Sequence, residues 1–223
     1  MMPQRQLRRD LPPIPPRMQV LPIEDRGYPV PWFVEWIDGK PDFRVMDRRK
    51  WGLAIRFGYC WLCGEPCGVL RTFVIGPMCG INRTTSEPAC HLDCARFAAI
   101  ACPFMTLPKA QYRKAAMPTG YVDAAGFPSD RNPGATCLWT TREFNVFRVP
   151  SDTGNTGKLI RIGEPRSVEW FAEGRHATRA EVLHSIEGGL PDLAKLAAAQ
   201  GPDAVEALKQ HILAFQKYLP AAA

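Results

Sequence analysis

The sequence lacks the motifs that identify the common nucleotide-dependent and hydrolytic enzymes. It has no Walker-type phosphate loop, no nucleophile elbow and no dinucleotide fingerprint. Histidine is scarce, with 4 among 223 residues, and His176, His184 and His211 each stand alone in the second half of the chain. The sequence therefore favours a non-enzymatic protein, although absent motifs are weak evidence against unfamiliar chemistry.

Long apolar runs are missing as well. No stretch approaches the roughly 18 apolar residues of a membrane span, and the arginine-rich residues 1–9 contain no signal-peptide core. We therefore expect a cytoplasmic protein that does not contact a membrane. In that reducing compartment, the 8 cysteines are better explained as metal ligands or buried thiols than as disulfides.

What the sequence does contain is two ligand pairs at metal-binding spacing. Cys60-Trp61-Leu62-Cys63-Gly64 is followed, after 26 residues, by His91-Leu92-Asp93-Cys94. In a C-x-x-C-G turn two thiolates can converge on one ion, because glycine adopts the backbone angle that the turn requires. A helix that begins near His91 would place His91 and Cys94 on one face. We predict one Zn²⁺, with Cys60, Cys63, His91 and Cys94 as its ligands.

The ligand assignment has alternatives. Cys90 and Cys94 are four residues apart and could bind a metal from one helix face, with Cys90 in place of His91. Cys67, Cys79, Cys90 and Cys102 could form a second set of four, although their spacing does not require it. The run Cys60, Cys63, Cys67 does not have a common iron–sulfur spacing.

The predicted zinc is structural, because four protein ligands leave no open position for water. Residues 69–89 contain no histidine that could act as the general base of a His-Asn-His nuclease. The His-x-Glu signature of the zinc deaminases is also absent.

Cys60, Cys63, Gly64, His91 and Cys94 resemble the ligand pattern of treble-clef zinc fingers, with a β-rich segment at 69–76 between the two pairs. The resemblance covers about a fifth of the chain and implies a knuckle, a hairpin and a ligand-bearing helix around a structural zinc. Treble clefs bind nucleic acids or proteins or act as nucleases, so the fold alone selects no function. The phrases at 27–33, 74–79 and 87–91 are also similar to uncharacterised proteins of tailed phages and prophages.

The complete chain is expected to have an α+β fold in which a small treble-clef zinc-binding module is joined to a short-stranded antiparallel sheet with C-terminal helices. Residues 1–22 form a basic, proline-rich arm that we expect to be extended or disordered. Residues 23–108 hold a hairpin, a basic helix and the zinc module, 109–135 form a linker, and 136–223 contain the sheet and the helices.

Several elements have clear boundary signals. Asp38-Gly39 predicts the turn of a hairpin between 32–36 and 42–46, and Asp47 is the expected cap of a helix that ends at Gly58. Pro77 and Gly80 are expected to end the β-rich segment at 69–76. Strands are predicted over 136–141, 144–149, 158–162 and 167–172, and helices over 180–186, 191–199 and 203–219.

Basic residues are unevenly distributed. Residues 1–135 hold 18 Lys/Arg against 12 Asp/Glu, whereas residues 136–223 hold 10 of each. A basic zinc-finger half predicts salt-dependent nucleic-acid binding; the alternative is a protein-interaction or inhibitory module that binds a host or phage protein, with a purely structural zinc. The candidate nucleic-acid contacts are Arg48, Arg49, Lys50, Arg56, Arg71, Arg83 and Arg96.

Overall fold

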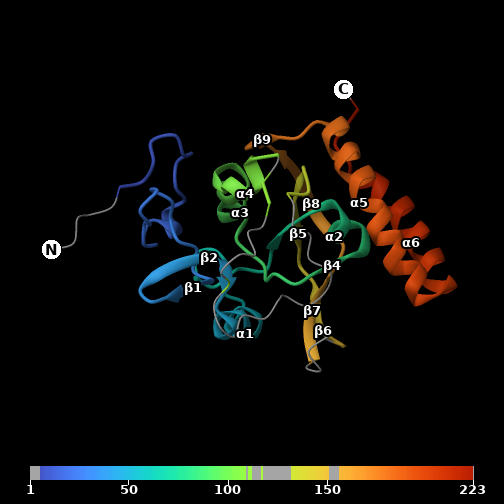
Figure 1. The fold of residues 1–223 in the computed structure, drawn as a ribbon, viewed down its shortest axis with the longest axis horizontal. Helices are drawn as coiled ribbons and strands as arrows, with labels where there is room; N and C mark the ends of the chain where they lie inside the picture. Colours follow the sequence, from blue (N-terminus) through green and yellow to red (C-terminus); the bar gives the residue numbers. More distant parts are fainter. Residues whose placement is uncertain (1–5, 109, 112–116, 118–131, 151–155, 223) are drawn as a thin grey trace.

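A computed structural model describes residues 6–108, 110–111, 117, 132–150 and 156–222. The fold is mixed α/β, with antiparallel sheets and C-terminal helices (Figure 1). Its elements are η1 Pro16–Met18, β1 Val34–Ile37, β2 Lys40–Met46, α1 Arg48–Phe57, β3 Arg71–Ile75, α2 Pro77–Asn82, β4 Thr84–Thr85, α3 Leu92–Ala101, α4 Pro103–Thr106, β5 Thr136–Thr141, β6 Phe144–Pro150, β7 Thr156–Ile162, β8 Pro165–Ala172, β9 Arg175–His176, α5 Arg179–Gln200, α6 Pro202–Phe215 and η2 Gln216–Tyr218.

The hairpin and the first helix confirm their sequence signals. β1 and β2 are antiparallel, and both turn residues, Asp38 and Gly39, have positive φ angles. The carboxylate of Asp47 accepts hydrogen bonds from the backbone N–H groups of Arg49 and Lys50 at the start of α1. Gly58 ends α1 in the left-handed conformation. These caps pair backbone groups that a helix end leaves without partners.

The central sheet joins the two predicted halves of the chain. Its strand order is β3-β5-β8-β9, and β3 pairs with β5 from Arg71 opposite Thr141 to Ile75 opposite Cys137. A second sheet has the order β4-β7-β6 and also combines the two halves. Both sheets therefore contain strands from residues 23–108 and from residues 136–223. Residues 110–111 and 132–135 lie in the predicted linker, most of which falls outside the described residues.

The segment between the ligand pairs also differs from the prediction. β3 confirms the predicted strand, but its ladder partner is β5, and only one isolated bridge, between Thr72 and Cys90, links β3 to the segment before α3. β3 ends at Ile75, just before Pro77, as predicted, but Pro77 and Gly80 then both lie in a short helix, α2. Proline is compatible with the first position of a helix, where its missing N–H would have had no partner.

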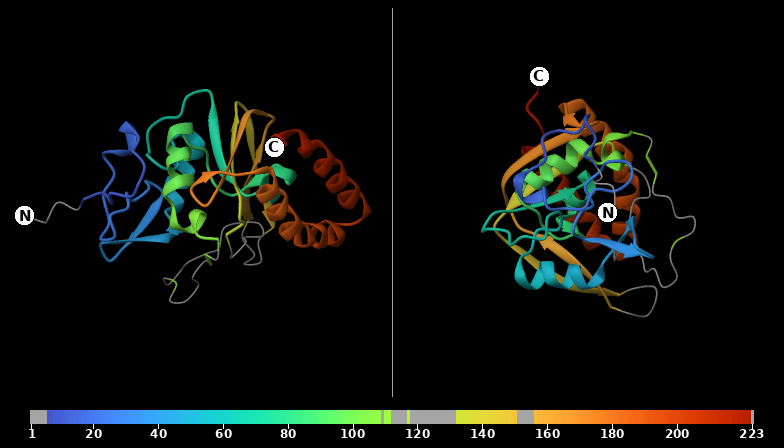
Figure 2. Two further views of the ribbon diagram at one scale, coloured as in Figure 1. Left: turned by 90° about the horizontal axis from the view of Figure 1, so that it is seen from above. Right: turned by 90° about the vertical axis from the view of Figure 1, so that its left-hand side faces the viewer.

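Helices cover both faces of the central sheet, which is why every residue of β5 is buried. Leu138 and Phe171 point to a first core that includes α3 and the cysteines of the knuckle. Trp139 and Trp170, on the opposite face, belong to a second core with α5 and α6. Figure 2 shows the resulting order, with the N-terminal segment at one end, the sheets in the middle and the two long helices at the other end.

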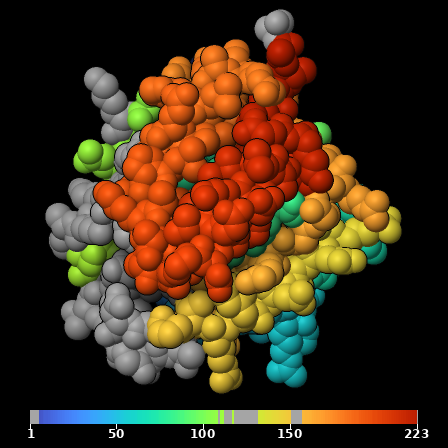
Figure 3. All heavy atoms as spheres, turned by 90° about the vertical axis from the view of Figure 1, so that its right-hand side faces the viewer, coloured from blue at the N-terminus to red at the C-terminus, as the bar shows by residue number. Residues whose placement is uncertain are grey.

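The C-terminal helices form a hairpin over the second core and cover one side of the molecule (Figure 3). The Phe215 ring stacks on Trp139, and the indole N–H of Trp170 donates to the Tyr218 carbonyl. The predicted break at Pro191 is wrong, since α5 continues through it. A proline inside a helix removes one N–H from the ladder and its ring crowds the carbonyl four residues earlier. Packing of Leu190 and Leu193 against the second core opposes this cost.

The N-terminal arm is packed, in contrast to the expectation of an extended or disordered segment. Met18 is 2% exposed and lies in the first core with the knuckle cysteines. Leu11, Ile14 and Leu21 pack against the same core. The apolar residues between the prolines therefore bury enough surface to hold residues 6–22 on the rest of the fold.

Candidate metal centre

The fold brings the two predicted ligand pairs together. The ligand atoms of Cys60, Cys63, His91 and Cys94 all lie within 4.8 Å of one another, close enough to hold a metal ion. Cys60 and Cys94 are fully buried, and Cys63 is nearly so. Within the described part of the chain, no other group of three or more Cys, His, Asp or Glu side chains is arranged in this way.

The knuckle depends on Gly64. Its φ angle of 81° is in the left-handed region, and its N–H donates to the Cys60 carbonyl at 2.9 Å. The Cys60 N–H in turn donates to the Glu65 carbonyl at 2.7 Å, which closes the turn. A Cβ atom at position 64 would lie 2.7 Å from the indole ring of Trp32. Glycine thus allows both the backbone turn and the close approach of Trp32.

His91 places its ring at the start of α3, beside the cysteine ligands. It is the N-cap residue of this helix, and Cys94 lies in the first turn. Its Nδ1 is 3.4 Å from Cys63 Sγ and 4.0 Å from Cys94 Sγ, whereas its Nε2 is 3.1 Å from the Pro66 carbonyl oxygen. Nε2 must carry the proton to donate to this carbonyl, so the Nδ1 lone pair faces the sulfur atoms. Metal-bound histidines are commonly oriented by a backbone carbonyl in this way.

The protonation of the metal-free cluster is asymmetric. Hydrogen bonds from the surrounding thiols, Cys63 foremost, lower the pKa of Cys60. The backbone N–H groups of Cys63 and His91 also point to Cys60 Sγ, at 3.5 and 3.4 Å. Donation to Cys60 raises the pKa of Cys63 to about 11 and raises that of Cys94 as well. The site therefore stabilises one thiolate, and a cation is needed to deprotonate the other two thiols near neutral pH.

Arg17 adds a positive charge next to the cluster. Its Nε is 3.2 Å from Asp93 Oδ2. Burial by itself would lower the pKa of Arg17, but the combined attraction to nearby groups, Asp93 foremost, raises it overall. A site of three thiolates and one imidazole around a divalent ion carries a net charge of −1, which a nearby arginine compensates. No local sequence pattern predicts this contact, since Arg17 lies 76 residues from Asp93.

The alternative ligand sets are not assembled. The thiols of Cys67 and Cys90 contact Cys60, and this contact raises the pKa of both. Neither residue belongs to the group of four. The second predicted set, which needed Cys79 and Cys102 as well, is not brought together among the described residues.

The predicted nucleic-acid contacts have different environments. Arg48, Arg49 and Arg56 are exposed on α1, while Lys50 is half-buried and donates to the Val34 carbonyl. Arg49 forms an ion pair with Asp47. Arg48 and Arg56 form no ion pair with a described residue and can reach an anion, whereas Arg49 is paired with Asp47 and Lys50 is held by its neighbours.

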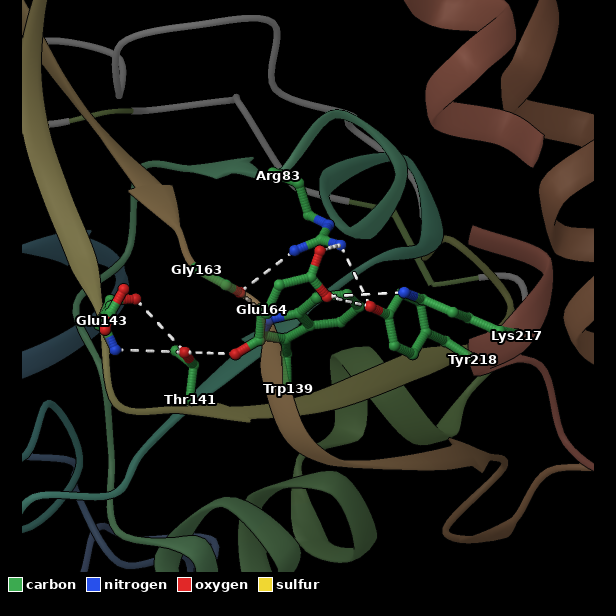
Figure 4. A network of polar contacts seen from close by, with 8 residues as sticks. All are labelled: Arg83, Trp139, Thr141, Glu143, Gly163, Glu164, Lys217 and Tyr218. Atoms are coloured by element: carbon green, nitrogen blue, oxygen red, sulfur yellow. Dashed lines mark hydrogen bonds and ion pairs between the residues drawn. The ribbon is translucent and has the colours of Figure 1, made fainter. Parts of the chain in front are cut away.

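Two of the predicted arginines connect parts of the fold. Arg83 lies over the Trp139 ring at 4.5 Å, donates to the Gly163 carbonyl and pairs with Glu164 at 3.0 Å (Figure 4). Arg96 donates two hydrogen bonds to Glu169, at 2.8 and 2.6 Å, and so links α3 to β8. These contacts indicate a structural role for both side chains.

We predicted no nucleic-acid contact in the second half, because equal numbers of acidic residues concealed its basic side chains. Arg142, Arg148, Lys158 and Arg161 are all exposed, and none of them forms an ion pair within the described residues. Three of these four residues lie on β6 and β7. Strand alternation alone could have placed them on the surface, but not next to α1.

Comparison with protein-family models, curated proteins and solved structures found no match. No helix among the described residues is both long and apolar enough to cross a membrane.

Proposed function

We propose that this protein is a zinc-stabilised nucleic-acid-binding protein of the cytoplasm. The zinc is structural and is held in a treble-clef-like unit by Cys60, Cys63, His91 and Cys94. The observation that carries the binding function is a set of exposed cations on α1 and on the β6–β7 ribbon, which lie beside each other.

The contact between α1 and the ribbon is specific. Lys158 of β7 lies over the ring of Trp51 of α1, with 5.8 Å between Nζ and the ring centroid. Trp51 is itself fixed by a hydrogen bond from its indole N–H to the Ser86 carbonyl. The basic residues Arg48 and Lys158 therefore belong to one surface even though they are 110 residues apart.

Within the ribbon, Arg148 is directly opposite Lys158. Like charges in this position destabilise an antiparallel pair, and no described carboxylate forms an ion pair with either. A phosphate backbone would neutralise both charges and release its condensed counterions. Nucleic acid is thus the partner class that best fits this surface.

Zinc is the metal that best fits the ligands. Thiolate and neutral imidazole suit Zn²⁺, and four such ligands complete its coordination. With no open position, the ion fixes the knuckle to the start of α3 and has no part in catalysis. We expect one zinc per chain by mass spectrometry on protein purified without a metal-affinity column. Iron or an absence of metal would refute this assignment.

The binding proposal is tested by the salt dependence of affinity. Fluorescence anisotropy with labelled DNA and RNA, between 50 and 200 mM salt, should give a steep negative slope of log K against log salt. Arg148→Glu/Lys158→Glu should weaken binding and reduce the slope by about 2, because two phosphate contacts are lost.

The matched control is Lys195→Glu/Lys209→Glu, which makes the same charge change at exposed positions of α5 and α6. This control should keep most of the affinity and the slope. Equal losses in both double variants would show that net charge, and not the ribbon, governs binding. No measurable binding by the wild type would refute the proposed function.

A further inference from the structure

A surface hollow lies between the loop after the knuckle and the turn that joins β5 to β6. It is lined by Val69, Arg71, Arg142, Glu143, Phe144 and Asn145. The ladder between β3 and β5 creates it, because Arg71 is paired with Thr141 and the β5–β6 turn begins one residue later. The hollow therefore combines two segments that are 70 residues apart in the sequence.

Two arginines give the hollow its charge. Arg142 is exposed, and Arg71 is half-buried with its guanidinium 5.1 Å from the centroid of the Phe144 ring. Neither forms an ion pair with a described residue. Glu143 is the one carboxylate in the lining, and its backbone N–H is bonded to Thr141 Oγ1. Two guanidinium groups can bind an anionic group, and arginine is well suited to phosphate.

Arg71 is held in place before any ligand arrives. A Cβ atom on Gly58 would lie 2.9 Å from Arg71 Nη2, so the bare glycine at the end of α1 makes room for the guanidinium. The C-terminal end of a helix carries partial negative charge and favours a cation there. Phe144 on one side and the end of α1 on the other hold the Arg71 side chain in place. Less conformational entropy is therefore lost when a ligand binds.

Exposed apolar side chains occur next to Arg71 in the sequence. Val69, which lines the hollow, is 71% exposed, and Leu70 is 49% exposed. Phe57 is 51% exposed next to Gly58, and the Arg56 guanidinium lies 5.1 Å from its ring centroid. In duplex DNA the base faces are stacked and inaccessible, so apolar side chains beside phosphate-binding arginines match single strands better.

We propose that this hollow binds single-stranded nucleic acid. A phosphate contacts Arg71 and Arg142, and an unstacked base lies against Val69 and the Arg71–Phe144 pair. Glu143 and Asn145 then face the edge of that base, where amino groups are the donors that a carboxylate accepts. This inference rests on the proposed nucleic-acid binding and specifies which form of the nucleic acid enters the hollow.

The test compares a labelled 12-nucleotide single strand with a duplex of the same length by fluorescence anisotropy at fixed salt. Arg71→Gln/Arg142→Gln should bind the single strand at least tenfold more weakly and the duplex less than twofold more weakly. Val69→Ser, which removes no charge, should also weaken single-strand binding selectively. The control is Arg166→Gln, an exposed arginine of β8, which should leave both affinities unchanged. Metal content and circular dichroism verify that each variant is folded.

Several results would overturn the inference. Equal losses for single strand and duplex would make the hollow a general phosphate contact, and unchanged affinities would show that it binds neither. Displacement of the single strand by low-millimolar inorganic phosphate would reduce it to a simple anion site. If the wild type bound a labelled polyglutamate peptide and no nucleic acid, the proposed function would fail as well. Duplex binding that depends on Arg148 and Lys158 but not on the hollow would refute only this inference.

Discussion

Replacing Gly64 by alanine should destabilise the protein through two effects that can be separated. The φ angle of 81° would cost an L-residue about 1–2 kcal/mol. The new Cβ atom would also lie 2.7 Å from the Trp32 ring, and forcing extra volume into a packed site costs about 1–3 kcal/mol more. The sum, about 2–5 kcal/mol, is the expected loss in free energy of unfolding.

Gly39→Ala is the matched control. Gly39 has a similar φ of 73°, yet nothing lies within 4 Å of its missing Cβ. Only the backbone cost of about 1–2 kcal/mol should appear. Urea unfolding at a fixed, saturating concentration of free zinc measures both variants. Equal losses in the free energy of unfolding for Gly64→Ala and Gly39→Ala would refute the steric contribution of Trp32.

A double-mutant cycle locates the steric contribution. Trp32→Ala removes the clash, so Gly64→Ala/Trp32→Ala should be about 1–3 kcal/mol more stable than the sum of the single changes predicts. Gly64→Ala should also weaken zinc binding, because the turn that orients Cys63 is strained. Gly39→Ala should leave the zinc affinity unchanged. If the effects of Gly64→Ala and Trp32→Ala on the free energy of unfolding were additive, the backbone would have shifted to accommodate the methyl group.

The remaining predictions concern the metal ligands and Arg83. Cys94→Ala should lose the metal by mass spectrometry and Cys90→Ala should retain it; the reverse result would make Cys90 the ligand. Metal binding to the apo protein must displace the protons of Cys63, whose pKa is raised to about 11, and of Cys94, so apparent zinc affinity should rise by about 100-fold per pH unit near neutrality. A pH-independent affinity in competition titrations would contradict this protonation pattern. Arg83→Met should reduce the free energy of unfolding by about 1–2 kcal/mol, because it removes the hydrogen bonds to Gly163 and Glu164, whereas Trp139 and Tyr218 still donate to these acceptors. It should not change the salt slope of nucleic-acid binding. The exposed control Arg161→Met should cost less than about 0.5 kcal/mol; a reduced slope for Arg83→Met would mean that Arg83 contacts phosphate.

Local signals in the sequence were sufficient for many elements. Asp47 and Gly58 marked the ends of α1 because capping depends on backbone groups within a few residues. The strand at 136–141 has the same bounds in the structure. The two ligand pairs could also be found, since Cys60 with Cys63 and His91 with Cys94 each require only a short turn or the start of a helix.

The failures occurred where long-range packing opposes a local preference. Pro191 is a helix breaker by itself, but α5 packs on the second core and continues through it. The prolines of residues 6–22 predicted disorder, but the intervening apolar side chains find a surface on the first core. β3 pairs with β5 because its partner is selected by the sheet and not by proximity in the chain.

By itself the sequence identified the candidate metal ligands, with Cys90 open as an alternative to His91, and the capped ends of α1. Only the tertiary structure decided which charges are available. It buried Arg83 against Trp139, brought Arg17 to the cysteines and placed Arg71 and Arg142 around one hollow. Ligand spacing and capping are local properties of the backbone, whereas exposure and charge pairing depend on contacts between residues that the chain does not connect directly.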